Sequence, residues 1–97
     1  MNCKPTKNFK IIMDQLGKNY SSKIIDMELC GYRKLNNNFD IEISGINDNK
    51  KVNLDISVYL WKLNPDPIIF ASYPNIKSIN DLLQTLKIIE EQYLPSN

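Results

Sequence analysis

Apolar and polar residues alternate with a period of two through much of the middle of the chain, and this alternation constrains the fold more than any other feature. A period of two places successive side chains on opposite faces of a β-strand. The apolar positions then share one face and the polar positions share the other. Because the apolar face must be covered by a second layer, the pattern predicts a half-buried antiparallel sheet.

Four strands are predicted, over residues 23–35, 39–44, 52–60 and 68–73. Turn-forming segments separate them: Asn36-Asn37-Asn38, Asn47-Asp48-Asn49-Lys50-Lys51 and Asn64-Pro65-Asp66-Pro67. A three-residue loop at the first turn sets Leu35 opposite Phe39 and Lys34 opposite Asp40, which keeps apolar residues with apolar ones. Pro74 is expected to end the last strand. The isolated Gly31 and Gly45 are expected to mark a bulge or close packing beneath a helix.

Amphipathic helices are predicted at both ends of the chain. Phe9, Ile12, Met13 and Leu16 repeat at helical spacing between a Thr6 N-cap and a Gly17 stop. Ser78 and Asp81 match a capping box, and apolar residues at helical spacing follow as far as about residue 94. The predicted layout is α-β-β-β-β-α: one two-layer α+β domain, in which both helices cover one face of a four-stranded antiparallel meander.

Several classes of chemistry lack the residues they require. The chain has no histidine, which excludes a Ser-His-Asp triad, a Cys-His pair and His-ligated zinc. Its three glycines are isolated, so no phosphate-binding glycine loop is present. Cys3 and Cys30 are too few for a zinc site or a disulfide scaffold, and Cys30 has no histidine to activate it. We expect a non-enzyme without catalytic residues, cofactor or metal.

A metal site built from carboxylates is a weaker possibility. Asp26, Glu28, Glu42 and Asp55 offer oxygen ligands for a divalent cation, but no ordered ligand spacing supports a site, and a solvated strand face is the simpler interpretation.

The N-terminus lacks the apolar run of a signal peptide, and no run of 18 apolar residues follows. These features predict a cytoplasmic protein that does not associate with membranes.

Aromatic residues on the uncovered face of the sheet are the candidate partner-binding residues. Tyr32, Tyr59, Trp61 and Phe70 are expected on that face. Tyrosine and tryptophan are enriched at the energetically important positions of interfaces. The alternative is that these rings pack on one another across strands or beneath a loop.

Lysines are concentrated toward the start of the chain. Residues 1–23 hold five lysines against Asp14 and carry +4, although the whole chain carries only +1. Lys7, Lys10 and Lys18 are candidate contacts for phosphate or for an acidic partner. A basic helix face beside exposed aromatic rings would suit single-stranded nucleic acid, whereas a solvated helix face explains the same lysines without a ligand. The near-zero total charge argues against both a DNA mimic and a strongly basic nucleic-acid binder.

The composition also indicates the kind of genome that encodes the chain. Ile, Asn and Lys supply 14, 13 and 11 residues, a bias typical of AT-rich coding. In size, coding bias and layout the chain resembles the small anti-defence proteins of phages and mobile elements, the anti-CRISPR proteins among them. This resemblance rests on no motif, and no residue role is carried over from it. It implies an inhibitor that occludes a protein surface or blocks assembly of a host defence complex.

From the residues themselves we predict a non-catalytic protein-binding module. One alternative is a homo-oligomeric structural or adaptor protein that pairs through an edge strand, either 68–73 or the first strand. The other is a small single-stranded nucleic-acid-binding domain.

Overall fold

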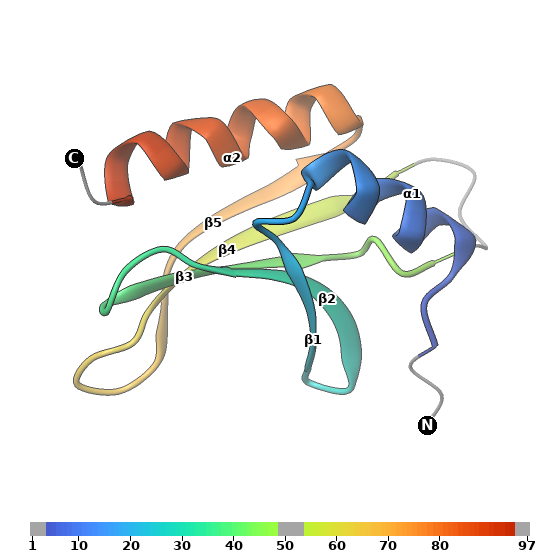
Figure 1. Ribbon diagram of the computed structural model, residues 1–97. Helices are drawn as coiled ribbons and strands as arrows, with labels where there is room; N and C mark the ends of the chain where they lie inside the picture. The colour runs from blue at the N-terminus through green and yellow to red at the C-terminus, as the bar shows by residue number, and fades with distance from the viewer. Residues whose placement is uncertain (1–3, 49–53, 95–97) are drawn as a thin grey trace.

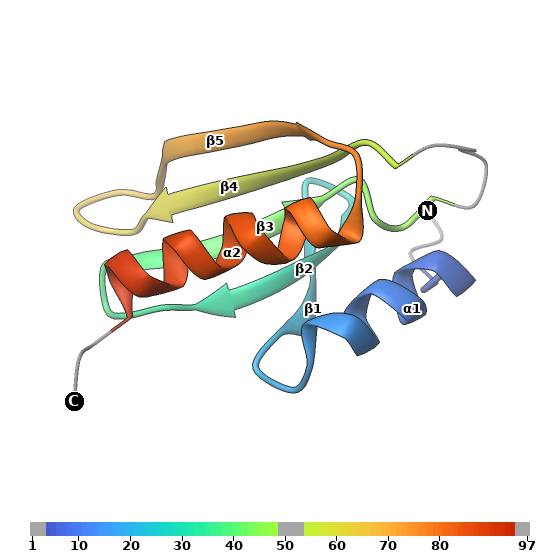
Figure 2. The ribbon, with the colours of Figure 1, turned by 90° about the horizontal axis from the view of Figure 1, so that it is seen from above.

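The computed structural model describes residues 4–48 and 54–94. Its elements are, in chain order, α1 (Lys7–Leu16), β1 (Ser21–Ile25), β2 (Glu28–Lys34), β3 (Phe39–Ser44), β4 (Ile56–Lys62), β5 (Ile68–Ile76) and α2 (Ile79–Tyr93). The strands form one antiparallel meander in the order β1-β2-β3-β4-β5. Both helices lie on the same face of this sheet (Figure 1), with α2 over its middle and α1 toward the β1–β2 end (Figure 2). The predicted α+β architecture is confirmed, with five strands where four were expected.

The additional strand arises because residues 23–35 form a hairpin and not one continuous strand. Asp26 and Met27 form its two-residue turn, with φ values of 50° and 68°. Positive φ at both central residues suits the twist of a hairpin, but the usual turn signals, Asn-Gly or Asp-Gly, are missing here. The turn also changes the phase of the alternation. One continuous strand over residues 23–35 would put Ile25 on the same face as Leu29, but Ile25 pairs with Glu28 on the outer face of the sheet.

The opposite, helix-covered face of the sheet forms the hydrophobic core. Five side chains of β3 and β4 are fully buried there: Ile41, Ile43, Ile56, Val58 and Leu60. The buried stripes of α1 and α2 pack against them, through Phe9 and Ile12 and through Leu82, Leu86 and Ile89. Full burial of such side chains stabilises a fold by about 1.5–3 kcal/mol each, so this layer is the main source of stability.

The predicted caps and the first predicted turn are confirmed. Oγ1 of Thr6 accepts a hydrogen bond from the Phe9 amide, and Oγ of Ser78 accepts one from the Asp81 amide, both at 3.1 Å. In the asparagine turn the Leu35 amide donates to the Phe39 carbonyl at 3.0 Å, and the strands continue with Lys34 opposite Asp40. This is the register of a three-residue loop.

The boundaries of the last two strands differ from expectation. β4 begins at Ile56, whereas the predicted start, residue 52, and part of the turn at 47–51 lie outside the described residues. β5 continues through Pro74 to Ile76, so the expectation that Pro74 ends the strand is wrong. Proline is tolerated there because β5 is an edge strand whose register shifts between Tyr73 and Ile76.

A polar cluster joins α2 to the sheet on the helix-covered side. The single arginine, Arg33, donates from Nη1 to Oε2 of Glu90 at 2.9 Å, and the hydroxyl of Tyr20 donates to the same oxygen at 2.7 Å. Glu90 lies near the C-terminus of α2, where a carboxylate opposes the helix dipole. Its two donors offset that unfavourable position. Burial, and then the Glu90 carboxylate, raise the pKa of Tyr20.

Gly17 and Gly45 have nearly equal φ values but different surroundings, so Gly17 can serve as the control in a test of the steric role of Gly45. Gly45 has φ 86°, and a Cβ there would lie 2.5 Å from the Asp55 carbonyl oxygen. Gly17 has φ 84°, and a Cβ there would meet nothing within 4 Å. We expect Gly17→Ala to lower the free energy of unfolding by about 1–3 kcal/mol through backbone strain alone. Gly45→Ala should lower the free energy of unfolding further in urea denaturation, because the backbone at residue 45 must also move away from the Asp55 carbonyl. Equal losses would contradict this steric account.

Candidate functional site

The outer face of the sheet, which the helices leave uncovered, is hollow. The β1–β2 hairpin and the β4–β5 connection both bend away from the helices on either side of it (Figure 1). Two adjoining hollows of about 320 and 270 Å³ lie between them and share Ile25, Glu42 and Trp61. We call these two hollows together the outer groove. Strands β2, β3 and β4 form its floor, and Ile25 of β1 and Ile69 of β5 lie at its two sides.

Three of the four predicted aromatic residues meet in the outer groove. Tyr32 comes from β2, and Tyr59 and Trp61 come from alternate positions of β4. All three are half-buried, so part of each ring faces the groove. The sequence pattern therefore placed these residues on the correct face.

Phe70 lies on the other side of the sheet, so its expected place among the outer aromatic residues is wrong. It is the additional residue of a bulge between the pairs Leu60–Ala71 and Trp61–Ile69. Its ring packs edge-on against Phe39 at a centroid distance of 5.4 Å, and Phe39 in turn contacts Tyr93 of α2. The bulge shifts the alternation of β5, and no sequence feature marks it.

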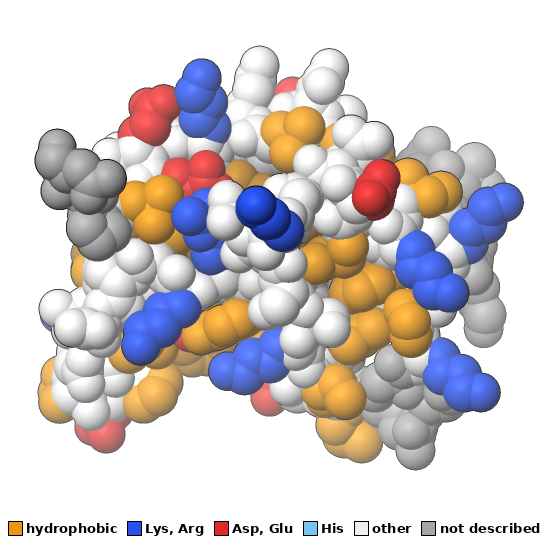
Figure 3. All heavy atoms as spheres, viewed as in Figure 1, with side chains coloured by type: hydrophobic (Ala, Val, Ile, Leu, Met, Phe, Trp, Pro, Cys, Tyr) orange, Lys and Arg blue, Asp and Glu red, His pale blue; other side chains and the backbone are white. Residues whose placement is uncertain are grey.

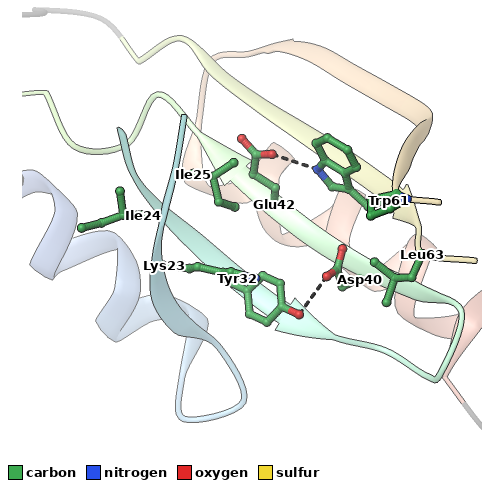
Figure 4. A pocket seen from close by; sticks show the side chains of 9 residues that line it. Lys23, Ile24, Ile25, Tyr32, Asp40, Glu42, Trp61 and Leu63 are labelled. Carbon is green, nitrogen blue, oxygen red and sulfur yellow. Dashed lines mark hydrogen bonds between the residues drawn. The ribbon is translucent and has the colours of Figure 1, made fainter. Parts of the chain in front are cut away.

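Two buried carboxylates of β3 are hydrogen-bonded to the aromatic residues (Figure 4). Asp40 and Glu42 are each only 7% exposed. The hydroxyl of Tyr32 donates to Oδ2 of Asp40 at 2.8 Å, and Nε1 of Trp61 donates to Oε1 of Glu42 at 2.9 Å. In register, Tyr32 is opposite Glu42 and Trp61 is opposite Asp40, so both bonds run diagonally between strands. These bonds fix the rings relative to the sheet.

Two more polar groups of the outer face are fixed in the same way. The Glu28 carboxylate accepts hydrogen bonds from Oγ of Ser44 at 2.9 Å and from the Gly45 amide at 2.7 Å. The Cys30 thiol is fully buried, with Sγ 3.7 Å from Oε2 of Glu42. Burial, followed by the charge of Glu28, raises the pKa of Cys30 to about 12, so the thiol is protonated at neutral pH. A protonated, buried thiol is a packing group and a poor nucleophile.

The outer groove is acidic. Its lining includes four carboxylates, from Asp26, Glu28, Asp40 and Glu42, against a single lysine, Lys23. Nζ of Lys23 lies 4.4 Å from the centroid of the Tyr32 ring, within the range of a cation–π contact. The sequence reasoning did not select Lys23 or Asp40 as site residues. No sequence feature singles out Asp40, which lies opposite Lys34 of β2 and Trp61 of β4 in the strand register.

The candidate basic residues lie away from this groove. Lys7 and Lys10 are exposed on α1, and Lys18 is exposed just beyond it, so all three belong to the helix side of the sheet. Basic side chains on the side seen in Figure 3 are scattered and do not form one patch. The predicted combination of a basic helix face beside exposed aromatic rings is therefore not formed.

The carboxylates considered for a cation do not converge. Within residues 4–48 and 54–94 no group of three or more Cys, Asp or Glu is arranged to hold a metal ion. Asp55 instead pairs with Lys77 at 3.2 Å. Within the same ranges no helix is long and apolar enough to cross a membrane. The other cysteine, Cys3, lies outside the described residues.

No protein-family model, no curated protein and no solved structure matches this chain. The chemistry of the outer groove is therefore the basis for a functional proposal.

The raised pKa of Cys30 predicts a loss of stability at alkaline pH. Its ordinary pKa is 9.0 and its folded pKa is about 12, so above pH 9 the unfolded chain loses the proton first and unfolding is favoured. This contribution is intact below pH 9 and disappears as the pH approaches 12, with a slope of at most about 1.4 kcal/mol per pH unit. Urea denaturation between pH 8 and 10 should show a steeper loss for the wild type than for Cys30→Ala. Identical slopes would show that Cys30 does not titrate differently in the two states.

Proposed function

We propose that this chain is a non-catalytic protein-binding module of the cytoplasm that contacts its partner through the outer groove. The observation that carries the proposal is the meeting of Tyr32, Tyr59 and Trp61 in one concave surface. Such rings contribute large contact areas at low cost in conformational entropy, and they dominate binding energy at protein interfaces. Exposed apolar area continues beside them at Ile69, which is 47% exposed.

The rigidity of the groove supports a binding role. Tyr32 and Trp61 are each held by a carboxylate of β3, and that strand lies in the middle of the sheet. Side chains fixed before binding lose less entropy when a partner arrives. A surface built in this way is suited to recognition of a complementary protein surface.

An inhibitor of a host defence complex is the more specific form of this proposal. It rests on the resemblance in size, coding bias and layout to anti-defence proteins. In this form the outer groove would occlude a surface that the complex needs for assembly or for target binding. The acidic lining of the groove does not have the density of charge needed for phosphate mimicry, since aromatic rings occupy much of the same surface.

Self-association through an edge strand is less well supported than binding through the groove. β5 has two register shifts and contains Pro74, and β1 is only five residues long. Bulges, proline and short length are the features by which natural edge strands avoid pairing with other strands. Ile68, Ile69 and Phe70 nevertheless expose apolar area at the start of β5, so the mass in solution should be measured alongside binding.

The proposal is tested with two isoleucines of equal exposure on opposite sides of the molecule. Ile69 in the groove and Ile11 on α1 are both 47% exposed. Peptides selected from a random library on the wild-type protein should bind Ile69→Ser and Tyr59→Ala at least about tenfold more weakly, the usual effect of losing an interface anchor. Binding to Ile11→Ser should stay within about twofold of wild type.

Two further results would count against the proposal. Selected peptides that bind all three variants equally would place recognition outside the groove. A stable dimer by light scattering, dissociated by Ile69→Ser, would favour the adaptor alternative. Circular dichroism and urea midpoints must show that each variant remains folded.

A further inference from the structure

We infer that the outer groove accepts an arginine side chain of the partner protein, between Tyr32 and Trp61 and against the carboxylates of Asp40 and Glu42. This inference deepens the proposed function and rests on it, because it names the chemistry of a partner for the same surface. It is carried by charge complementarity, by the aromatic rings beside the charges, and by a cation of the chain itself that already lies in the groove.

Among the described residues, no lysine or arginine forms an ion pair with the carboxylates that line the groove. Asp40 and Glu42 are hydrogen-bonded to neutral donors, a phenol, an indole and a thiol. Among the described residues the ion pairs are found elsewhere, at Arg33–Glu90 on the helix side and at Lys77–Asp55. Lys34 lies opposite Asp40 in the β2–β3 register, but these two described residues form no ion pair.

Each of these carboxylates retains capacity for another donor. An ionised carboxylate has about four lone-pair positions, and its aromatic partner occupies only one of them. Asp40 and Glu42 occupy alternate positions of β3, so both face the groove. A cation bound between them would gain charge-assisted hydrogen bonds, which are about twice as strong as neutral ones.

Lys23 shows that a cation fits over the Tyr32 ring in this groove. Its Nζ lies over the Tyr32 ring at 4.4 Å, and its side chain lines the groove together with Asp40, Glu42 and Trp61 (Figure 4). Lys23 is itself exposed and is held on the edge strand β1, so a partner cation can displace it at little cost. The chain's own lysine thus occupies the face of the Tyr32 ring and competes there with a partner cation.

Arginine fits this groove better than lysine does. Its guanidinium is planar, stacks on aromatic faces and presents a fork of donors to carboxylates. A groove with aromatic rings and acceptors together offers both types of contact, whereas an ammonium would use mainly its charge. A nucleic-acid backbone would bring phosphates against four carboxylates and would be repelled.

The inference can be tested with a short defined probe. Trp61 is the only tryptophan, so its fluorescence reports binding in the groove. We expect acetyl-Gly-Arg-Gly-amide to change this fluorescence saturably at millimolar concentration. The citrulline peptide, which is neutral and of the same shape, should bind at least about fivefold more weakly, since it lacks the charge-assisted bonds. The lysine peptide should fall between them.

Substitutions sharpen the test. Glu42→Gln and Asp40→Asn keep the shape of the side chains and an acceptor for the aromatic donors, and each should weaken the arginine peptide at least about threefold. Lys23→Met should strengthen it by a similar factor, because the competing cation is gone. Glu91→Gln, exposed on α2 on the far side of the sheet, is the matched control and should change nothing.

Several outcomes would overturn the inference. These are no saturable response to the arginine peptide, equal binding of the citrulline peptide, or no effect of Glu42→Gln, Asp40→Asn and Lys23→Met in folded proteins. The peptides selected on the wild-type protein separate this failure from failure of the proposed function. If those peptides require Tyr59 and Ile69 but tolerate citrulline in place of arginine, the binding module stands and the arginine site does not. If they do not require Tyr59 and Ile69, both proposals fail.

Discussion

The burial of β3 on both of its faces is the constraint on which the rest of the structure depends. On one face Ile41 and Ile43 are completely covered by the two helices, and on the other Asp40 and Glu42 are only 7% exposed. Buried apolar side chains are stabilised by packing alone, whereas buried carboxylates must also accept hydrogen bonds. The main donors are the hydroxyl of Tyr32 on β2 and the indole N–H of Trp61 on β4. The two buried carboxylates of this central strand are therefore satisfied chiefly by aromatic residues on the outer face of the sheet.

The hairpin at Asp26 and Met27 converts that outer face into a groove. Without the turn, residues 23–35 would form one strand in which Ile25 and Leu29 share a face. With it, Lys23 and Ile25 belong to the outer face and border the hollow at its β1 side. At the other side, the bulge in β5 turns Phe70 toward Phe39 and α2, and leaves Ile69 beside Trp61. The shape of the groove is thus set by two local irregularities of the sheet.

The distribution of charge explains why composition says so little about function. The net charge of +1 is the sum of a basic N-terminal segment and an acidic remainder. In the folded chain, Lys7, Lys10 and Lys18 lie on the helix side, whereas the carboxylates of the outer groove outnumber its single lysine. The outer face of the sheet is therefore acidic and aromatic, which supports the proposed binding of a cationic protein segment.

The sequence by itself determined the layers, both helices with their caps, the asparagine turn with its register, and the face on which Tyr32, Tyr59 and Trp61 lie. These features depend on periodicity and on local hydrogen bonds, both of which are determined by residues close together in the sequence. Only the tertiary structure decided the fifth strand, the placement of Phe70 and the continuation of β5 through Pro74, because the twist and the edge of the whole sheet determine where a turn or a bulge is tolerated. It alone also brought Lys23, Asp40 and Trp61, from three different strands, around one groove, since contacts between strands leave no periodic trace in the sequence.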